Sequence, residues 1–550
     1  MANNNFLIAA GGTGMRCLQA FVNLCAIGMY KELGKVHVLL MDTDEENKDK
    51  RNAENLIQSY RKIRNSIGGS EYFSCDIELS VFVPDYSKDD RRNFVMLSQL
   101  ERGASDINHK LANIFYEDAA QEFNLSHGYR AQTHLGSYLM YHAFIEEIKK
   151  AISNPVYQNS SELYKFIKDI STANESEARV FAFGSSFGGT GASSIPIIPK
   201  AISDCAKIIT GGNINPDKIY YSGVVLSNYF KFSSPTDTQK RDEKVIADSQ
   251  FFSHNSAAAL NFYVNDFTIS KTYKRLYLLG WPKADVDLEK YKSEVLQAQD
   301  TNNVAGTTTG GKLQENPAHL LEVFAASAAH HFFSPTFTGK DELKNIASTQ
   351  FQYKSLLEFD DRLVIEADDI LFKKSDTNDI TQIPYHEEVR KNLISFYSLA
   401  KLLRAKYDGN INYLADDLKL YNSKYNITDE ISETLSYFIN YFSAYPKDGG
   451  KDLVPGWFSQ VFSTLKISVG VEGKEFLGID SNYFKYSTQD WFVPYLELNG
   501  KKSPEDIFIT KFKKINGNEV GGEIGEMLEA LRKTFNSFTL DSYNSKEDTL

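Results

Sequence analysis

The pattern of apolar and polar residues in the first half of the chain predicts strands that alternate with helices. Residues 6–10 form a short apolar run, a glycine-rich turn follows it, and apolar residues then recur at helical spacing. A second apolar run, residues 36–41, ends in a polar turn. This order is typical of a βαβ unit, whose two strands lie parallel in one sheet. The first turn consists of Gly11, Gly12, Thr13 and Gly14, and the polar turn of Asp42, Thr43 and Asp44.

The same order of elements returns further along the chain. Residues 179–184 predict a buried strand, a second glycine-rich turn follows it, and an apolar helix is expected from there to residue 202. This second turn contains Gly188, Gly189, Thr190 and Gly191. Further strands are predicted at 219–226 and 274–279, and further helices at 137–152, 255–267 and 318–333. Strands and helices that alternate in this way indicate an α/β fold with a central, largely parallel sheet.

At 550 residues the chain is long enough for two or three domains. The regular alternation ends near residue 340, and beyond it a strand pair near 356–372 and amphipathic helices at 387–404 and 428–442 are expected. Segment 300–313, rich in Gly, Thr and Asn, has little to bury and is expected to be mobile or to become ordered only on contact with a ligand or partner. The expected divisions are an α/β domain at 1–270, an α+β domain at 271–450, a C-terminal extension at 451–540 and a disordered tail at 541–550.

Composition narrows the classes of function. The formal net charge of -12 argues against a nucleic-acid partner. The four cysteines form no CxxC pair, so neither a disulfide framework nor a zinc site is expected. The first residues lack the basic start and apolar run of a signal peptide, and no apolar window reaches the roughly 18 residues of a membrane span. We therefore expect a cytoplasmic protein.

The two glycine-rich turns are the strongest chemical signal in the chain. A turn of glycines at the start of a helix exposes backbone N–H groups and the positive end of the helix dipole, which together attract phosphate. One such turn is equally well explained by tight packing of a strand on a helix. Two turns that follow parallel strands would meet at the carboxyl edge of one sheet, where α/β proteins bind ligands. The sequence therefore predicts that both turns hold one polyphosphate.

Residues Phe187 to Ser193 resemble the signature of the tubulin and FtsZ superfamily of GTPases, small-Gly-Gly-Thr-Gly-small-Gly. Phe187 and Ser193 differ from it, and the other five positions agree. The turn at Gly11 to Gly14 resembles the first phosphate loop of that family, and Asp42 to Asp44 resembles its Asn-Thr-Asp loop. Residues 128–136 resemble the loop that faces the γ-phosphate, which implies that Arg130, Ala131 and Gln132 lie near the nucleotide. Arg130 would then contact phosphate, and the alternative is that it pairs with a surface carboxylate.

The resemblance implies a tubulin/FtsZ-like fold that binds GTP or GDP with Mg²⁺. It implies that Asn228 lies beside the ribose and that Asn255 reads the edge of the guanine. An alternative for Asn255 is a helix N-cap, a position that asparagine favours. The resemblance also implies self-association as a filament or homo-oligomer, with a possible protein partner at the C-terminal domain. Because it covers roughly residues 6–335, the chain is more similar to divergent bacterial tubulin-like proteins than to tubulin or FtsZ.

Hydrolysis in this family needs an acidic loop from the next subunit. Glu322 is the best match for the acid that polarises water, followed by Glu315, and Asn316 is expected to help orient the water. Ala318 and Leu321 stand where the family has carboxylates. The sequence therefore predicts a GTPase whose turnover is slow or depends on assembly.

Two other functions fit parts of the pattern. A nucleotide-binding sensor or scaffold that does not hydrolyse its ligand would explain the displaced acidic loop. An NAD-dependent oxidoreductase would use Gly12 and Gly14 as part of a dinucleotide fingerprint, with Asp42 at the end of the next strand. Cys17 stands where that fingerprint has its third glycine, and the second glycine-rich turn would have no task.

Overall fold

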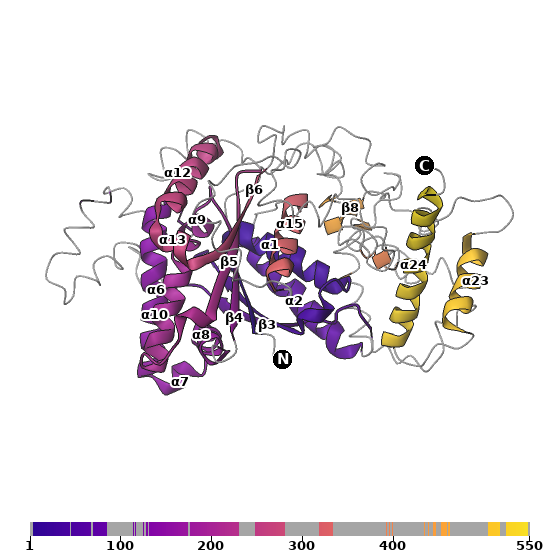
Figure 1. The fold of residues 1–550 in the computed structure, drawn as a ribbon, viewed down its shortest axis with the longest axis horizontal. Helices are drawn as coiled ribbons and strands as arrows, with labels where there is room; N and C mark the ends of the chain where they lie inside the picture. Colours follow the sequence, from indigo (N-terminus) through magenta and orange to yellow (C-terminus); the bar gives the residue numbers. More distant parts are fainter. Residues whose placement is uncertain are drawn as a thin grey trace.

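The structure is a computed structural model that describes residues 4–84, 128–229, 248–280, 318–333, 504–517 and 524–547 with short breaks, together with isolated residues elsewhere. Six parallel strands form one sheet in the order β3-β2-β1-β4-β5-β6 (Figure 1). The strands are β1 (Asn5–Ala10), β2 (Lys35–Met41), β3 (Asp76–Phe82), β4 (Ala178–Ser185), β5 (Ile219–Leu226) and β6 (Tyr273–Leu279). The predicted α/β class is confirmed, and the strand order is that of Rossmann-like folds.

Helices cover both faces of the sheet, which explains why its inner strands read as nearly continuous apolar runs. On β1, Leu7 and Ala9 pack into one hydrophobic cluster, whereas Phe6 and Ile8 pack into the other. The first cluster contains α1 (Gly11–Ala26), α2 (Lys48–Ser66) and α15 (Leu320–Phe333). The second contains α6 (Thr133–Ser153), α8 (Glu162–Ala173), α10 (Ile198–Thr210) and α12 (Phe252–Asn265).

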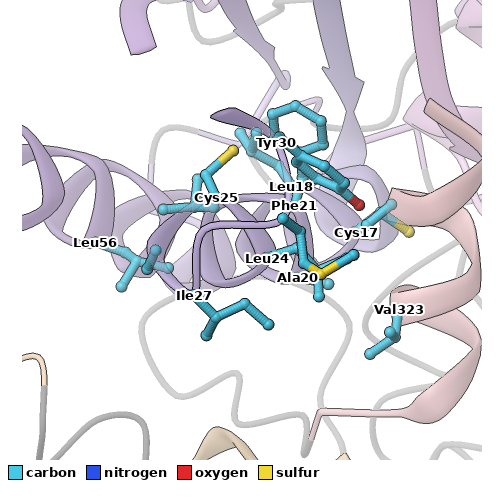
Figure 2. Packing of buried hydrophobic residues seen from close by; sticks show 14 of the residues in the cluster. Cys17, Leu18, Ala20, Phe21, Leu24, Cys25, Ile27, Tyr30, Leu56 and Val323 are labelled. Carbon is cyan, nitrogen blue, oxygen red and sulfur yellow. The ribbon is translucent and has the colours of Figure 1, made fainter. Parts of the chain in front are cut away.

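Helix α1 is the centre of the first cluster. Figure 2 shows its apolar side chains between Leu56 of α2 and Val323 of α15. Short elements complete the sheet domain: η1 (Lys31–Leu33), α7 (Pro155–Gln158), α9 (Thr190–Ser194), η3 (Pro216–Lys218), η4 (Ser249–Phe251) and α13 (Phe267–Thr272). Among the helices that the structure describes, none is both long and apolar enough to cross a membrane.

Two predictions about the sheet domain need correction. The helix expected after the second glycine-rich turn is broken into α9 and α10, because Pro196 has no N–H for the helical ladder. Strand β3 was not predicted. It lies at the edge of the sheet, and its polar and apolar residues are mixed, so it lacks the apolar run of a buried strand.

In the C-terminal part the structure describes α23 (Pro504–Asn516), α24 (Ile524–Glu547) and the short antiparallel pair β7 (Ala444–Pro446) and β8 (Leu453–Pro455). Helix α24 runs to Glu547, where a disordered tail was expected from residue 541. The elements expected at 356–372, 387–404 and 428–442 and the segment 300–313 lie outside the residues described, apart from isolated positions.

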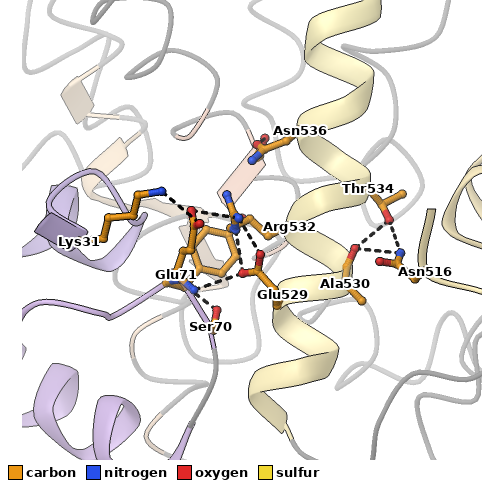
Figure 3. A network of polar contacts seen from close by, with 11 residues as sticks. Lys31, Ser70, Glu71, Asn516, Glu529, Ala530, Arg532, Thr534 and Asn536 are labelled. Atoms are coloured by element: carbon orange, nitrogen blue, oxygen red, sulfur yellow. Dashed lines mark hydrogen bonds and ion pairs between the residues drawn. The ribbon is translucent and has the colours of Figure 1, made fainter. Parts of the chain in front are cut away.

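Helix α24 is joined to the sheet domain by charged groups (Figure 3). Arg532 forms ion pairs with Glu71, at 3.0 Å, and with Glu529, at 2.6 Å. Glu71 also pairs with Lys31 at 3.1 Å, and its backbone N–H donates to Glu529 at 3.2 Å. These contacts attach the C-terminal helix to the loop that precedes β3, at the amino end of the strands, whereas the two glycine-rich turns follow the carboxyl ends of β1 and β4.

Candidate functional site

The two glycine-rich turns lie side by side at the carboxyl edge of the sheet. Strands β1 and β4 are paired in parallel with Ala9 opposite Phe183, so the turns that follow them emerge together. A Cβ atom on Gly11 would stand 3.1 Å from the backbone N of Gly191 and 3.2 Å from Cβ of Thr190. The strand order also changes direction between β1 and β4, which is the position where open α/β sheets bind ligands.

Some of the glycines are required by packing alone. A Cβ on Gly14 would lie 2.8 Å from the carbonyl O of Phe183, and one on Gly191 would lie 2.8 Å from the N of Ser185. At these two positions a side chain would separate helix from strand. Packing therefore accounts for one glycine in each turn. It leaves a partly exposed set that a ligand can reach: Gly12, Thr13, Gly188 and Gly189.

The amino terminus of α1 points to the same edge. Ala10 is the N-cap, no side chain in the described part of the molecule caps the helix, and its first turn has no acidic residue. The first N–H groups of a helix lack intrahelical partners and carry the positive end of its dipole. A helix of 16 residues thus presents uncapped donors beside the second glycine-rich turn.

Asp42 connects the loop after β2 to the second turn. Its Oδ1 accepts hydrogen bonds from the N–H of Thr43 at 2.8 Å and from Oγ1 of Thr190 at 3.1 Å, and its Oδ2 accepts from Nδ2 of Asn47 at 2.7 Å. Burial, followed by the charge of Asp44, raises the pKa of Asp42 to about 6. Both oxygens of Asp42 are thus used within the protein, and the residue holds Thr190 in place.

Two buried hydroxyls at this edge have no hydrogen-bond partner among the described residues, Oγ1 of Thr43 and Oγ of Ser227. Thr43 is 5% exposed. Buried hydroxyls are normally paired with protein or ligand. A Cβ on Gly128 would stand 3.6 Å from Oγ1 of Thr43 and 3.9 Å from Oγ1 of Thr190. The loop before α6 therefore meets the loop after β2 and the second turn at one point.

The loop before α6 adopts an unusual backbone. Gly128 has φ +81° and Ala131 has φ +63°, and Gln132 is the N-cap of α6. The hydroxyl of Ser137 donates to the carbonyl of Ser193 at 2.7 Å, which ties α6 to α9. The start of α6 thus lies against the second turn, and the placement of Ala131 and Gln132 beside a nucleotide stays a prediction. Arg130 lies outside the described residues.

Asn228 and the start of α12 form the neighbouring part of the edge. Nδ2 of Asn228 donates to Oγ of Ser253 at 3.2 Å, and the hydroxyls of Ser186 and Ser256 lie 3.0 Å apart. Asn255 is half-exposed in the first turn of α12. The N-cap of that helix is Phe251, so the interpretation of Asn255 as a capping residue is wrong.

Glu322 lies in a buried polar cluster behind the second turn. Its Oε1 accepts from Nε of Arg16 at 2.8 Å and from the hydroxyl of Tyr229 at 2.8 Å, and its Oε2 accepts from the N–H of His319 at 3.0 Å. Glu322 is 1% exposed. Burial, followed by the charge of Arg16, lowers the pKa of His319 to about 3. The Glu322 carboxylate is thus enclosed within one copy of the chain and paired there.

This cluster was not predicted apart from Glu322. Its one signal in the sequence is Arg16, a charged residue inside the apolar stretch of α1. The other two predicted residues of the acidic loop, Glu315 and Asn316, lie outside the described residues. In the portion of the chain that can be described, no group of three or more His, Cys, Asp or Glu side chains is arranged to hold a metal ion.

Comparison of the chain with protein-family models, with curated proteins and with solved structures found no significant match. The geometry of the sheet edge is therefore the basis on which a function can be argued.

Proposed function

We propose that this chain binds a guanine nucleotide at the carboxyl edge of its sheet, in the manner of tubulin- and FtsZ-like proteins. The contact between the two glycine-rich turns is the observation that carries the proposal. A phosphate chain beside Gly12 and Gly189 would meet backbone donors of both turns and the uncapped start of α1. The free hydroxyl of Thr43 would supply a further donor at the same point.

The remaining predicted residues have distinct tasks in this proposal. Thr190 donates its hydroxyl proton to Asp42, so its task is to hold the second turn in place beside the phosphates. Asp44 is buried next to Asp42, and its carboxylate together with phosphate oxygens would supply oxygen ligands of the kind that Mg²⁺ prefers. Asn228 and Asn255 lie at the neighbouring part of the edge, where ribose and base would extend from the phosphates. The preference for guanine is supported by the resemblance and by the amide of Asn255.

Hydrolysis of the nucleotide depends on where the predicted catalytic acid lies. Glu322 is buried and paired with Arg16, so it does not face a second copy of the chain. A nucleotide-binding sensor or scaffold is therefore the second candidate, and the paired state of Glu322 is the observation that favours it. Self-association with nucleotide between copies, and a protein partner at the C-terminal part, stay within the proposal on the resemblance alone.

The strand order would also suit a dinucleotide-dependent oxidoreductase. The hydrogen bonds of the carboxylate after the second strand do not suit such an enzyme. In such enzymes the carboxylate after the second strand accepts a ribose hydroxyl. Here both oxygens of Asp42 already accept from Thr43, Thr190 and Asn47. In addition, Cys17 at the place of the third glycine is fully buried. These contacts favour the mononucleotide.

The first test is to identify the bound compound. Purified full-length protein is denatured and the released nucleotides are separated by chromatography; the emptied protein is then titrated with fluorescent GDP, fluorescent ADP and NAD. We expect a guanine nucleotide and tighter binding of GDP than of the other two. Release of NAD, or equal affinity for GDP and ADP, would contradict the proposal.

The second test is Gly189→Val. Gly189 has φ -77°, a value that L-residues adopt, and the substitution fills the space of the phosphates. We expect GDP affinity to fall at least about 100-fold, or roughly 2.7 kcal/mol. Gly211→Asn is the matched control, because Gly211 ends α10 in a left-handed turn with nothing within 4 Å of its Cβ position. Unchanged affinity in Gly189→Val would remove the phosphates from this turn.

A further inference from the structure

Two of the four cysteines meet where the end of α1 lies beside the loop that precedes β3. The N–H of Phe73 donates to the carbonyl of Ala26 at 3.2 Å, so the two segments are in direct contact. Cys25 precedes Ala26, and Cys75 lies two residues after Phe73. The thiols of Cys25 and Cys75 are hydrogen-bonded to each other at this contact. A pair of thiols is thus placed between two segments that are distant in the chain.

Both thiols are enclosed in the structure. Cys25 and Cys75 are fully buried, and the hydroxyl of Tyr60 donates to the carbonyl of Cys75 at 2.8 Å, which places α2 over the pair. Burial, followed by the hydrogen bond with Cys75, raises the pKa of Cys25 well above its usual value. Because the thiolate is the reactive form of cysteine, the pair is inert as long as it stays enclosed.

The loop that covers the pair, residues 70–75, has a strained backbone. Phe73 has φ +56°, in the left-handed region that a bulky side chain rarely adopts. Such a conformation persists only where the surrounding structure holds it. The loop is therefore expected to leave its position when the contacts that hold it are released.

Those contacts come from the C-terminal part of the chain. The ring of Phe73 packs against that of Phe438, with centroids 5.1 Å apart. Glu71 forms an ion pair with Arg532 at 3.0 Å, and its N–H donates to Glu529 at 3.2 Å (Figure 3). The enclosure of the two thiols thus depends on residues that follow them by more than 350 positions.

We propose that Cys25 and Cys75 form a redox-sensitive pair that becomes reactive when α24 leaves the loop, and that its oxidant is a low-molecular-weight disulfide. One protein thiolate attacks a sulfur of that disulfide, which releases one small thiolate and leaves a mixed disulfide. The second protein thiolate attacks the protein sulfur of the mixed disulfide and releases the second small thiolate. Two protein thiols are thereby oxidised to one disulfide, the small disulfide is reduced, and the two protein protons pass to the two small thiols.

The disulfide would act as a covalent lock. It would join α1 to the residue before β3, across a closed loop that contains α2, and such a cross-link restricts the open states of the chain. The loop of residues 70–75 would then stay beside α1 whether or not α24 is attached. The inference depends on this contact alone and does not require a bound nucleotide.

Oxidation of the full-length protein by glutathione disulfide is the test, with the products located by peptide mass spectrometry. We expect a Cys25–Cys75 disulfide that forms about 5-fold faster in Arg532→Gln, because loss of a partly exposed ion pair raises the population of the open loop. Lys149→Gln is the matched control, since it removes a cation from an exposed ion pair on α6 and should react like the wild type. Failure of the disulfide to form, or equal rates in Arg532→Gln and the wild type, would overturn the proposal.

Cys205 is an internal control for unfolding. It is buried in the second hydrophobic cluster, on the other face of the sheet, so it should stay unmodified while the disulfide forms. Modification of Cys205 at the same rate would overturn the proposal, because unfolding of the sheet domain would then expose the thiols.

Cys25→Ala tests the pairing itself. In this variant Cys75 should keep glutathione as a mixed disulfide, because no second thiol remains to displace it. The wild type should pass through that state without accumulating it. Equal accumulation in both proteins would contradict a reaction between the two thiols.

Discussion

The buried polar groups on the two sides of the second glycine-rich turn differ in their hydrogen bonding. Behind the turn, Arg16, Tyr229 and Glu322 are buried and bonded to one another. At the open edge, the hydroxyl of Thr43 is equally buried and has no hydrogen-bond partner in the described part of the chain. Because buried polar groups are normally paired, the first set is complete as structure, and the second agrees with our proposal that a ligand completes it. Hydrogen bonding, more than charge, distinguishes the structural cluster behind the turn from the proposed binding edge.

The largest expected effect on stability comes from breaking the buried ion pair behind the turn. Glu322→Gln leaves the Arg16 guanidinium buried without its counter-charge, and loss of one partner of a buried pair costs about 3 to 5 kcal/mol. Urea denaturation should show this loss, and Glu146→Gln, which breaks an exposed pair with Lys149, should cost under about 1 kcal/mol. If the two variants were equally stable, the cluster behind the turn would not be a structural element.

The next effect is a dependence of stability on pH at the edge itself. The pKa of Asp42 is raised from 3.8 to about 6, so its contribution is fully present below pH 3.8 and is lost as the pH rises towards 6. The wild type should lose up to about 3 kcal/mol over that interval relative to Asp42→Asn, which does not titrate. Urea denaturation of both proteins from pH 4 to pH 7 measures the difference. Parallel curves would show that burial and the charge of Asp44 do not raise the pKa of Asp42.

The comparison also shows what the sequence could and could not predict. Both glycine-rich turns were predicted because each depends on local features, an apolar strand before the glycines and a helix after them. Their convergence followed from the rule that parallel strands end at one edge. The division between packing glycines such as Gly14 and reachable ones such as Gly189 needed coordinates, since the spacing of the glycines does not show which of them contacts a neighbouring strand.

The buried cluster behind the turn could not be predicted from the sequence, for a different reason. Arg16 and Glu322 are 306 residues apart, and Arg16 and Tyr229 are 213 apart, so no local pattern links them. The acidic loop of the resembling family suggested a catalytic task for Glu322. The structure gives the same residue a partner within its own chain, which a sequence of one copy could not indicate.

The smallest expected effect concerns the unpaired hydroxyl at the open edge. Thr43→Val replaces a buried, unpaired hydroxyl by a methyl group of the same shape, so the free energy of unfolding should stay the same or rise slightly. The variant should bind GDP about 10-fold more weakly, or about 1.4 kcal/mol, because one donor to phosphate is lost. Isothermal titration and urea denaturation measure the two quantities. Thr190→Val is the matched control, and it should lower both, since it also breaks the bond to Asp42. A Thr43→Val protein that is destabilised like Thr190→Val, with affinity unchanged, would show that the edge is already complete without a ligand.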